Sequence, residues 1–322
     1  MINLAILCPA EIAKRRFMPS LLKGQDFSFI GVGAHRREKA EAFLAEYPGR
    51  LFETYNEVIA SDDVEAVYIP LPPALHFEWA KKALESGKHV LLEKPFATNL
   101  SDAEDLLQLA GEKQLALHEN YMFVFHKQVE ELQKIIASGE IGDVRLMRMS
   151  FGFPMRPAGD FRYDKDLGGG AFLDAGGYCL RAAGLFLGET ASVTAATVNY
   201  TPDFDVDVFG SATVVNEEGT TAQLSFGMDN NYKCSLEIWG SKGTLKATRF
   251  FTAPSGYAPV ALLEKNGEVQ EIALSADDTF LKSIHYFRQC IEDGEIRKES
   301  AHAILKQAGL MEEFRWLAGF EM

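Results

Sequence analysis

Short apolar runs alternate with amphipathic stretches over the first 120 residues of the chain. The apolar runs predict strands, and the stretches with apolar residues three or four positions apart predict helices. The predicted strands cover residues 2–8, 27–34, 64–69, 89–92 and 115–120, and the predicted helices cover 11–23, 36–47, 55–61, 76–86 and a segment opened by a Ser101–Glu104 capping box. Strands that alternate with helices at this spacing predict an α/β domain, with a doubly wound parallel sheet covered on both faces.

After residue 120 the pattern changes from the helical period to a period of two. In the stretch 219–228, Ala222, Leu224 and Phe226 point one way, whereas Gln223 and Ser225 point the other way. The further predicted strands cover 206–215, 233–239, 244–247 and 260–264, with turns at 216–219, 240–243 and Asn266-Gly267, and helices at 125–138 and 299–320. The pattern predicts an α+β domain with a large, mainly antiparallel open sheet, one face of which is polar or covered by a partner.

Two domains are therefore expected, covering residues 1–120 and 121–322, with a C-terminal helix that could pack back on the first domain. The composition, with 47% hydrophobic and 24% charged residues, is that of a globular protein. A net charge of −14 argues against nucleic acid or an anionic membrane as partner. No apolar run is long enough to span a bilayer and the start lacks a basic signal region, so a cytoplasmic location is expected.

The four cysteines are far apart in the sequence and form no CxxC pair. A disulfide framework or a zinc site is therefore not expected, whereas free, buried thiols are.

Candidate binding residues follow the ends of the predicted parallel strands, where open α/β sheets bind ligands. The first of these turns contains Ala10, Glu11 and Ile12 and has no glycine, unlike the usual dinucleotide fingerprint. Backbone N–H groups at the start of the following helix can still face a phosphate, provided that the Glu11 side chain points away.

The second strand is followed by His35, Arg36 and Arg37, where sites for NAD usually have an acidic residue. Two guanidinium groups suit a 2′-phosphate, so NADP is favoured over NAD, although NAD remains possible. The alternative is a solvated basic start to a helix, which is less favoured because helix N-termini prefer acidic residues.

Two further strand ends carry candidate residues. Leu71 and Pro72 follow the third predicted strand, and His76 begins the next helix, where a histidine is more often a capping or packing residue than a catalyst. The strand 89–92 is followed by Glu93, Lys94 and a proline, which ends the strand because it has no N–H. A simple surface charge pair is the alternative interpretation.

Farther along the chain, three glycines at 168–170 precede Asp174 and Tyr178, which are four residues apart. This spacing places a carboxylate and a phenol on one face of a helix, and glycines before a helix allow a ligand to approach the backbone. A glycine-rich helix start with a buried tyrosine is the alternative.

These motifs together resemble the Gfo/Idh/MocA (glucose–fructose oxidoreductase / inositol dehydrogenase) family over essentially the whole chain. The resemblance extends within that family to the NADP-dependent nucleotide-sugar 3-ketoreductases of deoxysugar biosynthesis. The segments that carry it are 10–16 with Pro19, 68–73 with His76, 93–95, 119–121, 138–142, and Arg162-Tyr163 before the glycine-rich run that leads to Asp174.

The resemblance implies an NADPH-dependent oxidoreductase that reduces a keto group of a sugar, and the resemblance to the ketoreductase branch implies that this sugar is nucleotide-linked. It implies a cis Lys94-Pro95 bond, Tyr178 as proton donor, Lys94 as the group that stabilises the oxyanion, and Asp174 as an orienting carboxylate. It also implies that Glu93, Lys94, Asn120 and Arg162 contribute to the cofactor site and that the chain forms a homodimer or homotetramer through the second-domain sheet.

Most members of the family have a histidine where this chain has Tyr178. A phenol, with an ordinary pKa of about 10, gives a proton to an alkoxide more readily than it takes one from an alcohol. Two alternatives remain: an NADP-dependent dehydrogenase of a free sugar or dihydrodiol, and a non-catalytic NAD(P)-binding regulatory protein.

Overall fold

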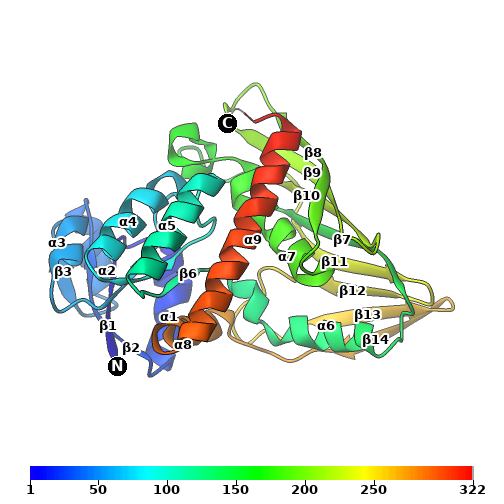
Figure 1. Cartoon of the computed structure of the whole chain (residues 1–322), viewed down its shortest axis with the longest axis horizontal. Helices are drawn as coiled ribbons and strands as arrows, with labels where there is room; N and C mark the ends of the chain where they lie inside the picture. Colours follow the sequence, from blue (N-terminus) through cyan, green and yellow to red (C-terminus); the bar gives the residue numbers. More distant parts are fainter. Residues whose placement is uncertain (321–322) are drawn as a thin grey trace. The chain divides into compact units, whose positions relative to one another are not determined.

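A computed structural model of the chain describes residues 1–320. The chain divides into two compact units (Figure 1). The first unit contains residues 1–120 and 280–308, and the second contains residues 121–279 and the chain from Gly309 onward. The long helix α9 (Gly294–Ala318) contributes its first part to one unit and its last part to the other.

The first unit is built on a six-stranded sheet in which every neighbouring pair of strands is parallel. Its strands, in spatial order, are β3 (Arg50–Phe52), β2 (Phe27–Gly33), β1 (Ile2–Ile6), β4 (Ala66–Ile69), β5 (His89–Leu92) and β6 (Leu117–Glu119). The order reverses between β1 and β4, which is where Rossmann-type sheets bind dinucleotides. The predicted parallel sheet is confirmed, and β3 is a strand that the apolar pattern did not predict.

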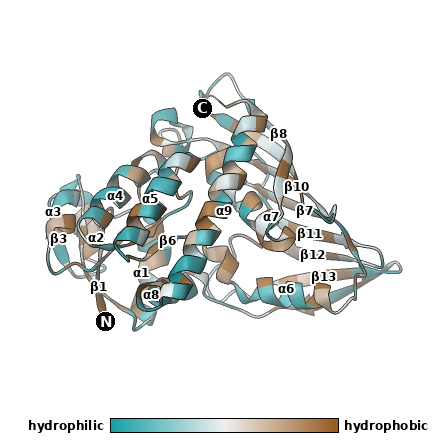
Figure 2. Ribbon diagram, in the orientation of Figure 1, coloured by the Kyte–Doolittle hydropathy of each residue, from teal (hydrophilic) through white to brown (hydrophobic). Residues whose placement is uncertain are grey.

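The helices of this unit are α1 (Met18–Lys23), α2 (Arg37–Leu44), α3 (Tyr55–Ala60), α4 (His76–Glu85), α5 (Leu100–Glu112) and α8 (Thr279–Glu292). Figure 2 shows apolar and polar residues alternating along α4 and α5, which pack against each other. Alternate residues of the central strands, such as Val67 and Val90, join these helices in one core, whereas Tyr68 faces the other way and stacks on Phe17 at 3.8 Å between ring centroids. Both faces are therefore covered, which explains the nearly continuous apolar runs.

Helix α5 (Leu100–Glu112) begins two residues earlier than a Ser101 cap requires. The side chain of Asn99 accepts a hydrogen bond from the backbone N–H of Asp102 and is the N-cap. The predicted Ser101–Glu104 capping box is therefore wrong, because an asparagine two positions earlier already satisfies the helix start.

The second unit is built on an eight-stranded sheet (Figure 1). Its strands, in spatial order, are β14 (Glu268–Ala273), β13 (Val260–Lys265), β12 (Thr244–Thr248), β11 (Lys233–Gly240), β7 (Val144–Gly152), β10 (Thr221–Gly227), β9 (Asp207–Val215) and β8 (Ser192–Tyr200). Among the described residues of this sheet, only the β7–β10 pair is parallel, so the predicted, mainly antiparallel sheet is confirmed. Strands β7, β8 and β14 were not predicted.

The two faces of this sheet differ as the alternation predicts. Ala222, Leu224 and Phe226 are buried in a core shared with α6 (Lys127–Ala137), α7 (Gly177–Leu187) and the end of α9. The opposite face is polar, with Arg148 donating to the Glu237 carboxylate at 2.9 Å across neighbouring strands. On this face, which no helix of this unit covers, charged groups therefore pair with charged groups across the strands, and hydroxyl groups pair with hydroxyl groups.

Within residues 1–320, no helix is long and apolar enough to cross a membrane. The four cysteines are free thiols, as predicted, but only Cys179, Cys234 and Cys290 are buried, whereas Cys8 is partly exposed.

Candidate active site

The first strand-to-helix turn of the first unit leads into a π-helical turn, Ala13–Phe17, which continues into α1. Proline at position 19 has no N–H to donate, and such positions favour an altered helical turn. Glu11 is exposed and its Oε2 lies 3.7 Å from Arg15 Nε, so its carboxylate is engaged along the helix. By helix geometry the N–H groups of Glu11 and Ile12, after Ala10, have no intrahelical acceptor and can receive a phosphate.

The two arginines after β2 have different surroundings. Arg37 donates from Nε to Glu41 and from Nη1 to Glu53, both at 2.9 Å, and the hydrogen bond with Glu41 and the charge of Glu53 raise its pKa. Arg36 is exposed at the N-cap of α2, and no carboxylate lies within ion-pair distance of it among residues 1–320. Arg36 is therefore the residue whose guanidinium is available to an incoming anion.

A buried hydrogen-bond network surrounds Glu93 at the end of β5. The Glu93 Oε1 atom accepts from the Tyr68 hydroxyl at 2.7 Å and from Asn120 Nδ2 at 2.6 Å. The Ser283 hydroxyl donates to Asn120 Oδ1 at 2.8 Å and lies 3.0 Å from His118 Nε2. Because the single hydroxyl proton is used toward Asn120, His118 Nε2 must be the donor to Ser283.

This network fixes the orientation of the Asn120 amide. Its oxygen faces the Ser283 donor, so its nitrogen faces Glu93. Burial raises the pKa of Glu93, and the hydrogen bonds from Tyr68 and Asn120 oppose that shift. The carboxyl that precedes Lys94 is thus held in one orientation within the interior of the unit.

His76 connects two loops at the carboxyl end of the sheet. Its Nδ1 lies 2.8 Å from the Pro95 carbonyl oxygen and its Nε2 lies 2.8 Å from the Leu71 carbonyl oxygen. The ring is fully buried, and burial lowers the pKa of His76 to about 4. It holds the segment of Leu71 and Pro72 against the Lys94-Pro95 segment, whose peptide bond is cis, as the resemblance implies.

In the second unit, a glycine-rich segment leads into the helix that carries Asp174 and Tyr178. That helix begins with a π-helical turn, Phe172–Gly176, which continues into α7. Gly170 has a φ of +116°, and a Cβ there would lie 2.3 Å from Asp207 Oδ1. Only glycine fits this approach, which brings the buried carboxylate of Asp207 to the start of the helix.

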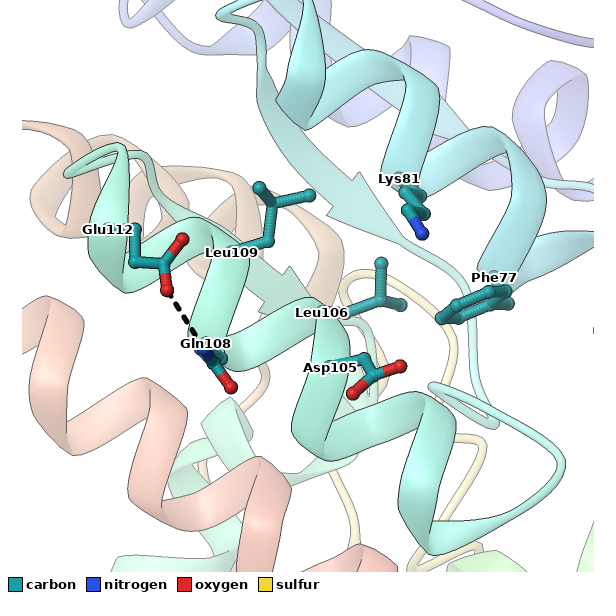
Figure 3. A pocket seen from close by; sticks show the side chains of 7 residues that line it. All are labelled: Phe77, Lys81, Asp105, Leu106, Gln108, Leu109 and Glu112. Atoms are coloured by element: carbon teal, nitrogen blue, oxygen red, sulfur yellow. Dashed lines mark hydrogen bonds between the residues drawn. The ribbon is translucent and has the colours of Figure 1, made fainter.

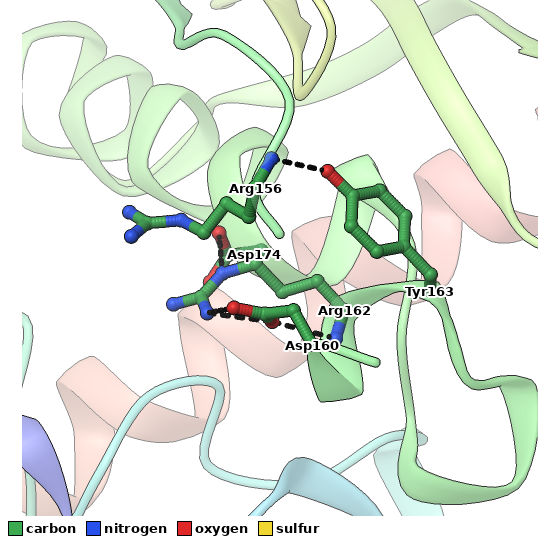
Figure 4. Close-up of polar contacts among 5 residues, drawn as sticks. All are labelled: Arg156, Asp160, Arg162, Tyr163 and Asp174. Atoms are coloured by element: carbon green, nitrogen blue, oxygen red, sulfur yellow. Dashed lines mark hydrogen bonds and ion pairs between the residues drawn. The ribbon is translucent and has the colours of Figure 1, made fainter. Parts of the chain in front are cut away.

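Asp174 forms an ion-paired cluster with Arg162 and Asp160 (Figure 4). Arg162 donates from Nε to Asp174 Oδ2 at 2.7 Å and from Nη1 to Asp160 Oδ1 at 3.0 Å. Burial acts to lower the pKa of Arg162, but the charges of Asp174 and Asp160 outweigh it and raise that pKa. The guanidinium is thus shared between two carboxylates, and the structure brings together two residues to which the sequence assigned separate roles.

The Tyr178 ring is enclosed by four aromatic rings, those of Tyr121, Phe123, Phe151 and Phe251, with centroids 5.1 to 6.0 Å away. The side chain is 6% exposed, and its hydroxyl lies 3.8 Å from Met122 Sδ. Thioether sulfur is a weak acceptor. Packing of the four surrounding rings holds the Tyr178 ring in place.

Within each unit, the structure therefore connects some predicted residues directly. Glu93 contacts Asn120 in the first unit, and Arg162 contacts Asp174 in the second. Lys94 belongs to the first unit and Tyr178 to the second. The sequence pattern did not indicate Asp160, Asp207, Ser283 or His118 as site residues, and Tyr68 entered only within the segment 68–73 that carries the resemblance. Only the polar character of Asp160, close to Arg162 in the sequence, could have indicated one of them.

A shallow pocket lies between α4 and α5 in the first unit (Figure 3). It is lined by Phe77, Lys81, Asp105, Leu106, Gln108, Leu109 and Glu112. None of these is a predicted site residue, and the pocket is a groove between two surface helices.

Comparison with known proteins gives matches over nearly the whole chain. Residues 5–121 match the model of an oxidoreductase family with an NAD-binding Rossmann fold (GFO/IDH/MocA), and residues 129–246 match the GFO/IDH/MocA C-terminal domain. The chain is 40% identical to a dTDP-3,4-didehydro-2,6-dideoxy-alpha-D-glucose 3-reductase from Actinomadura kijaniata, over 98% of this chain and 95% of that protein.

The crystal structure of a 3-ketoreductase from Actinomadura kijaniata, in complex with NADP and TDP-benzene, has a TM-score of 0.96. The similarity covers 98% of each chain at 40% identity. Structures of that enzyme with one tyrosine replaced by phenylalanine, or one lysine replaced by alanine, match with TM-scores of 0.96 and 0.92.

Proposed function

The chain belongs to the Gfo/Idh/MocA family of oxidoreductases, and from this premise we propose that it uses NADPH to reduce the C3 keto group of a dTDP-linked deoxysugar. The observation that carries this proposal is the similarity, over 98% of the chain, to a reductase of that substrate class. A non-catalytic role is disfavoured because Lys94, Asp174 and Tyr178 are all present.

The residues of the first unit fit NADP(H). An exposed Arg36 at a helix N-terminus, without a carboxylate partner among residues 1–320, suits the 2′-phosphate. The N–H groups of the first helical turn suit the diphosphate, because Glu11 is engaged with Arg15. NADPH, when bound, supplies the hydride for reduction of the carbonyl carbon.

We propose Lys94 and Tyr178 as the catalytic residues. The tyrosine and lysine replaced in the Actinomadura structures are separated along that chain by the same number of residues as Tyr178 and Lys94 are here. As hydride reaches the carbonyl carbon, negative charge develops on its oxygen. The Lys94 ammonium stabilises that charge, and the Tyr178 hydroxyl donates the proton that completes the alcohol.

Asp174 has a positioning role in this proposal. Its Oδ2 accepts from Arg162 at 2.7 Å, so its carboxylate is held in a fixed orientation four residues before Tyr178. Such a carboxylate can accept a hydroxyl of the sugar and orient the carbonyl. Arg162 acts through Asp174, and its proposed contact with the cofactor stays a prediction.

Kinetics of two variants test the catalytic assignments. Tyr178→Phe is expected to lower kcat by about 10²–10⁴, the usual contribution of general acid catalysis. Lys94→Ala is expected to lower kcat/KM, with the urea unfolding midpoint measured in parallel as a control for folding. Turnover of Tyr178→Phe close to that of the unmodified chain would show that another group donates the proton.

The substrate assignment is tested by comparing the dTDP-linked keto sugar with the corresponding free sugar. A large advantage for the nucleotide-linked substrate is expected. Equal or better turnover of the free sugar would instead favour an NADP-dependent dehydrogenase of unactivated sugars.

Assembly and location complete the proposal. We propose a homodimer or homotetramer formed through the polar face of the eight-stranded sheet, which mass measurement by light scattering tests. A cytoplasmic location is supported by the four free thiols, since reducing compartments preserve them.

A further inference from the structure

One end of the eight-stranded sheet gathers aromatic rings and guanidinium groups from three adjacent strands. Phe153 follows the end of β7, Tyr232 precedes β11, and Arg249 follows the end of β12. Cys234 of β11 pairs with Phe151 of β7, which places both strand ends at the same edge.

The strand alternation places these residues on the face that carries α7. Phe151, Cys234 and Ala247 are buried on the core side of the sheet, and the residues two positions beyond each of them toward this edge are Phe153, Tyr232 and Arg249. They therefore continue the core side of the sheet outward, with Phe153 still buried and Tyr232 and Arg249 exposed to solvent.

The Arg249 guanidinium lies between two tyrosine rings. Its Cζ is 5.6 Å from the ring centroid of Tyr232 and 5.9 Å from that of Tyr257. The Tyr232 hydroxyl is 3.0 Å from Thr252 Oγ1, which fixes the ring while 42% of the residue stays exposed. Arg249 has a φ of +52°, a conformation that a non-glycine residue rarely adopts and that often marks a functional position.

A second guanidinium lies near the same edge. The Arg156 Cζ is 5.1 Å from the ring centroid of Phe153. The backbone N–H of Arg156 donates to the Tyr163 hydroxyl at 2.8 Å, and Figure 4 shows its side chain beside the Asp174 cluster. Among residues 1–320, neither Arg156 nor Arg249 has a carboxylate within ion-pair distance.

This edge is adjacent to the proposed proton donor. The rings of Phe151 and Phe251 both pack against Tyr178. Phe151 is two residues from Phe153, and Phe251 is two residues from Arg249. A ligand that extends from Tyr178 along the sheet therefore reaches the two guanidinium groups.

We propose that Arg156, Arg249 and Tyr232 form the site for the nucleoside diphosphate half of the substrate, an inference that rests on the proposed function. Two guanidinium groups match the charge of a diphosphate, and they make this edge locally positive in a chain whose net charge is −14. The exposed Tyr232 ring provides a stacking surface for the base, as aromatic side chains do in other nucleotide sites. The site explains how a nucleotide-linked sugar is preferred over a free one.

Binding of dTDP alone to the full-length protein, measured by calorimetry, tests the proposal. Arg249→Ala and Arg156→Ala are each expected to weaken dTDP binding about 10- to 100-fold, the range for hydrogen bonds to charged groups. Tyr232→Ala is expected to weaken dTDP more than inorganic diphosphate, whereas Tyr232→Phe keeps the ring and retains the affinity. Arg145→Ala, at the far end of β7 where Arg145 pairs with Asp143, is the matched control.

The outcomes separate this inference from the proposed function. If the unmodified chain binds dTDP and both arginine variants bind it equally well, the assigned site is wrong while the substrate class stands. If only Arg156→Ala loses affinity, the assignment of Arg249 is wrong. If the unmodified chain does not bind dTDP yet reduces a free keto sugar, the proposed function and this site fail together.

Discussion

The Asp207 carboxylate accepts a 2.7 Å hydrogen bond from the backbone N–H of Phe172. This contact ties the start of β9 to the first turn of the helix that carries Asp174 and Tyr178. The carboxylate is 3% exposed, and Gly170 is required at φ +116° to leave room for its other oxygen. The position of the proposed catalytic helix thus depends on a buried acid that is remote in sequence.

The Asp207 contact predicts a specific dependence of stability on pH. Burial raises the pKa of Asp207 from 3.8 to about 6. The native state therefore binds this proton more tightly than the unfolded state, so the stability it contributes is present below about pH 4 and is lost as pH rises toward 6. The loss amounts to about 3 kcal/mol, at 1.36 kcal/mol per pKa unit.

Urea unfolding at pH 4 and pH 7 measures this effect. Asp207→Asn keeps an oxygen acceptor for the Phe172 N–H but carries no charge, so its free energy of unfolding should fall less between the two pH values. The neighbouring Tyr200 is the other titratable group facing Asp207, and it is neutral over this range. An identical pH dependence in both proteins would contradict the prediction.

The ion pair of Arg162 and Asp174 predicts non-additive variants. Their side chains are 20% and 10% exposed, so removing the arginine leaves Asp174 and Asp160 with uncompensated charge. Arg162→Ala should lower the free energy of unfolding by about 3 kcal/mol, at the low end for buried pairs. A double-mutant cycle with Asp174→Asn is expected to give a coupling of about 1–3 kcal/mol. Additive single effects would mean that the pair is not coupled.

The Asn120 network predicts that two substitutions within it differ in the pH dependence of their stability loss. Asn120→Asp places a second carboxyl where an amide nitrogen now lies 2.6 Å from Glu93. Two carboxylates at that distance raise each other's pKa, so this variant should lose stability as pH rises from 4 to 7. Denaturant unfolding at both pH values measures the loss.

Ser283→Ala is the control for that experiment. It removes the donor to Asn120 Oδ1 without adding a charge, and the expected cost is about 1–3 kcal/mol, independent of pH. A pH-dependent loss in Ser283→Ala equal to that in Asn120→Asp would show that carboxylate repulsion is not the cause.

The two arginines after β2 should differ in their effect on cofactor choice. Fluorescence titration with NADPH and NADH is expected to show a preference for NADPH that Arg36→Ala reduces by about 10-fold or more. Arg37→Ala should have a smaller effect, because its guanidinium already holds Glu41 and Glu53. Equal affinities for the two cofactors in all three proteins would exclude a phosphate contact at either arginine.

The local pattern of the sequence determined the elements and the two sheet types. Apolar runs separated by amphipathic stretches predicted the parallel sheet, and the alternation around Leu224 predicted the polar and apolar faces of the second sheet. These features are predictable because side-chain period is a local property of each backbone type. Strand β7 was missed because two apolar residues in succession, Leu146 and Met147, interrupt its alternation of apolar and polar positions.

Tertiary structure alone decided which polar groups meet. Ser283 reaches Asn120, and Asp207 reaches the Phe172 N–H, across long intervals of sequence that no periodicity connects. The same holds for Arg162, whose pairing with Asp174 depends on the fold of the glycine-rich segment between them. Residue types determine what chemistry is available, but long-range packing determines which groups lie within hydrogen-bond distance and which charges remain open to a ligand.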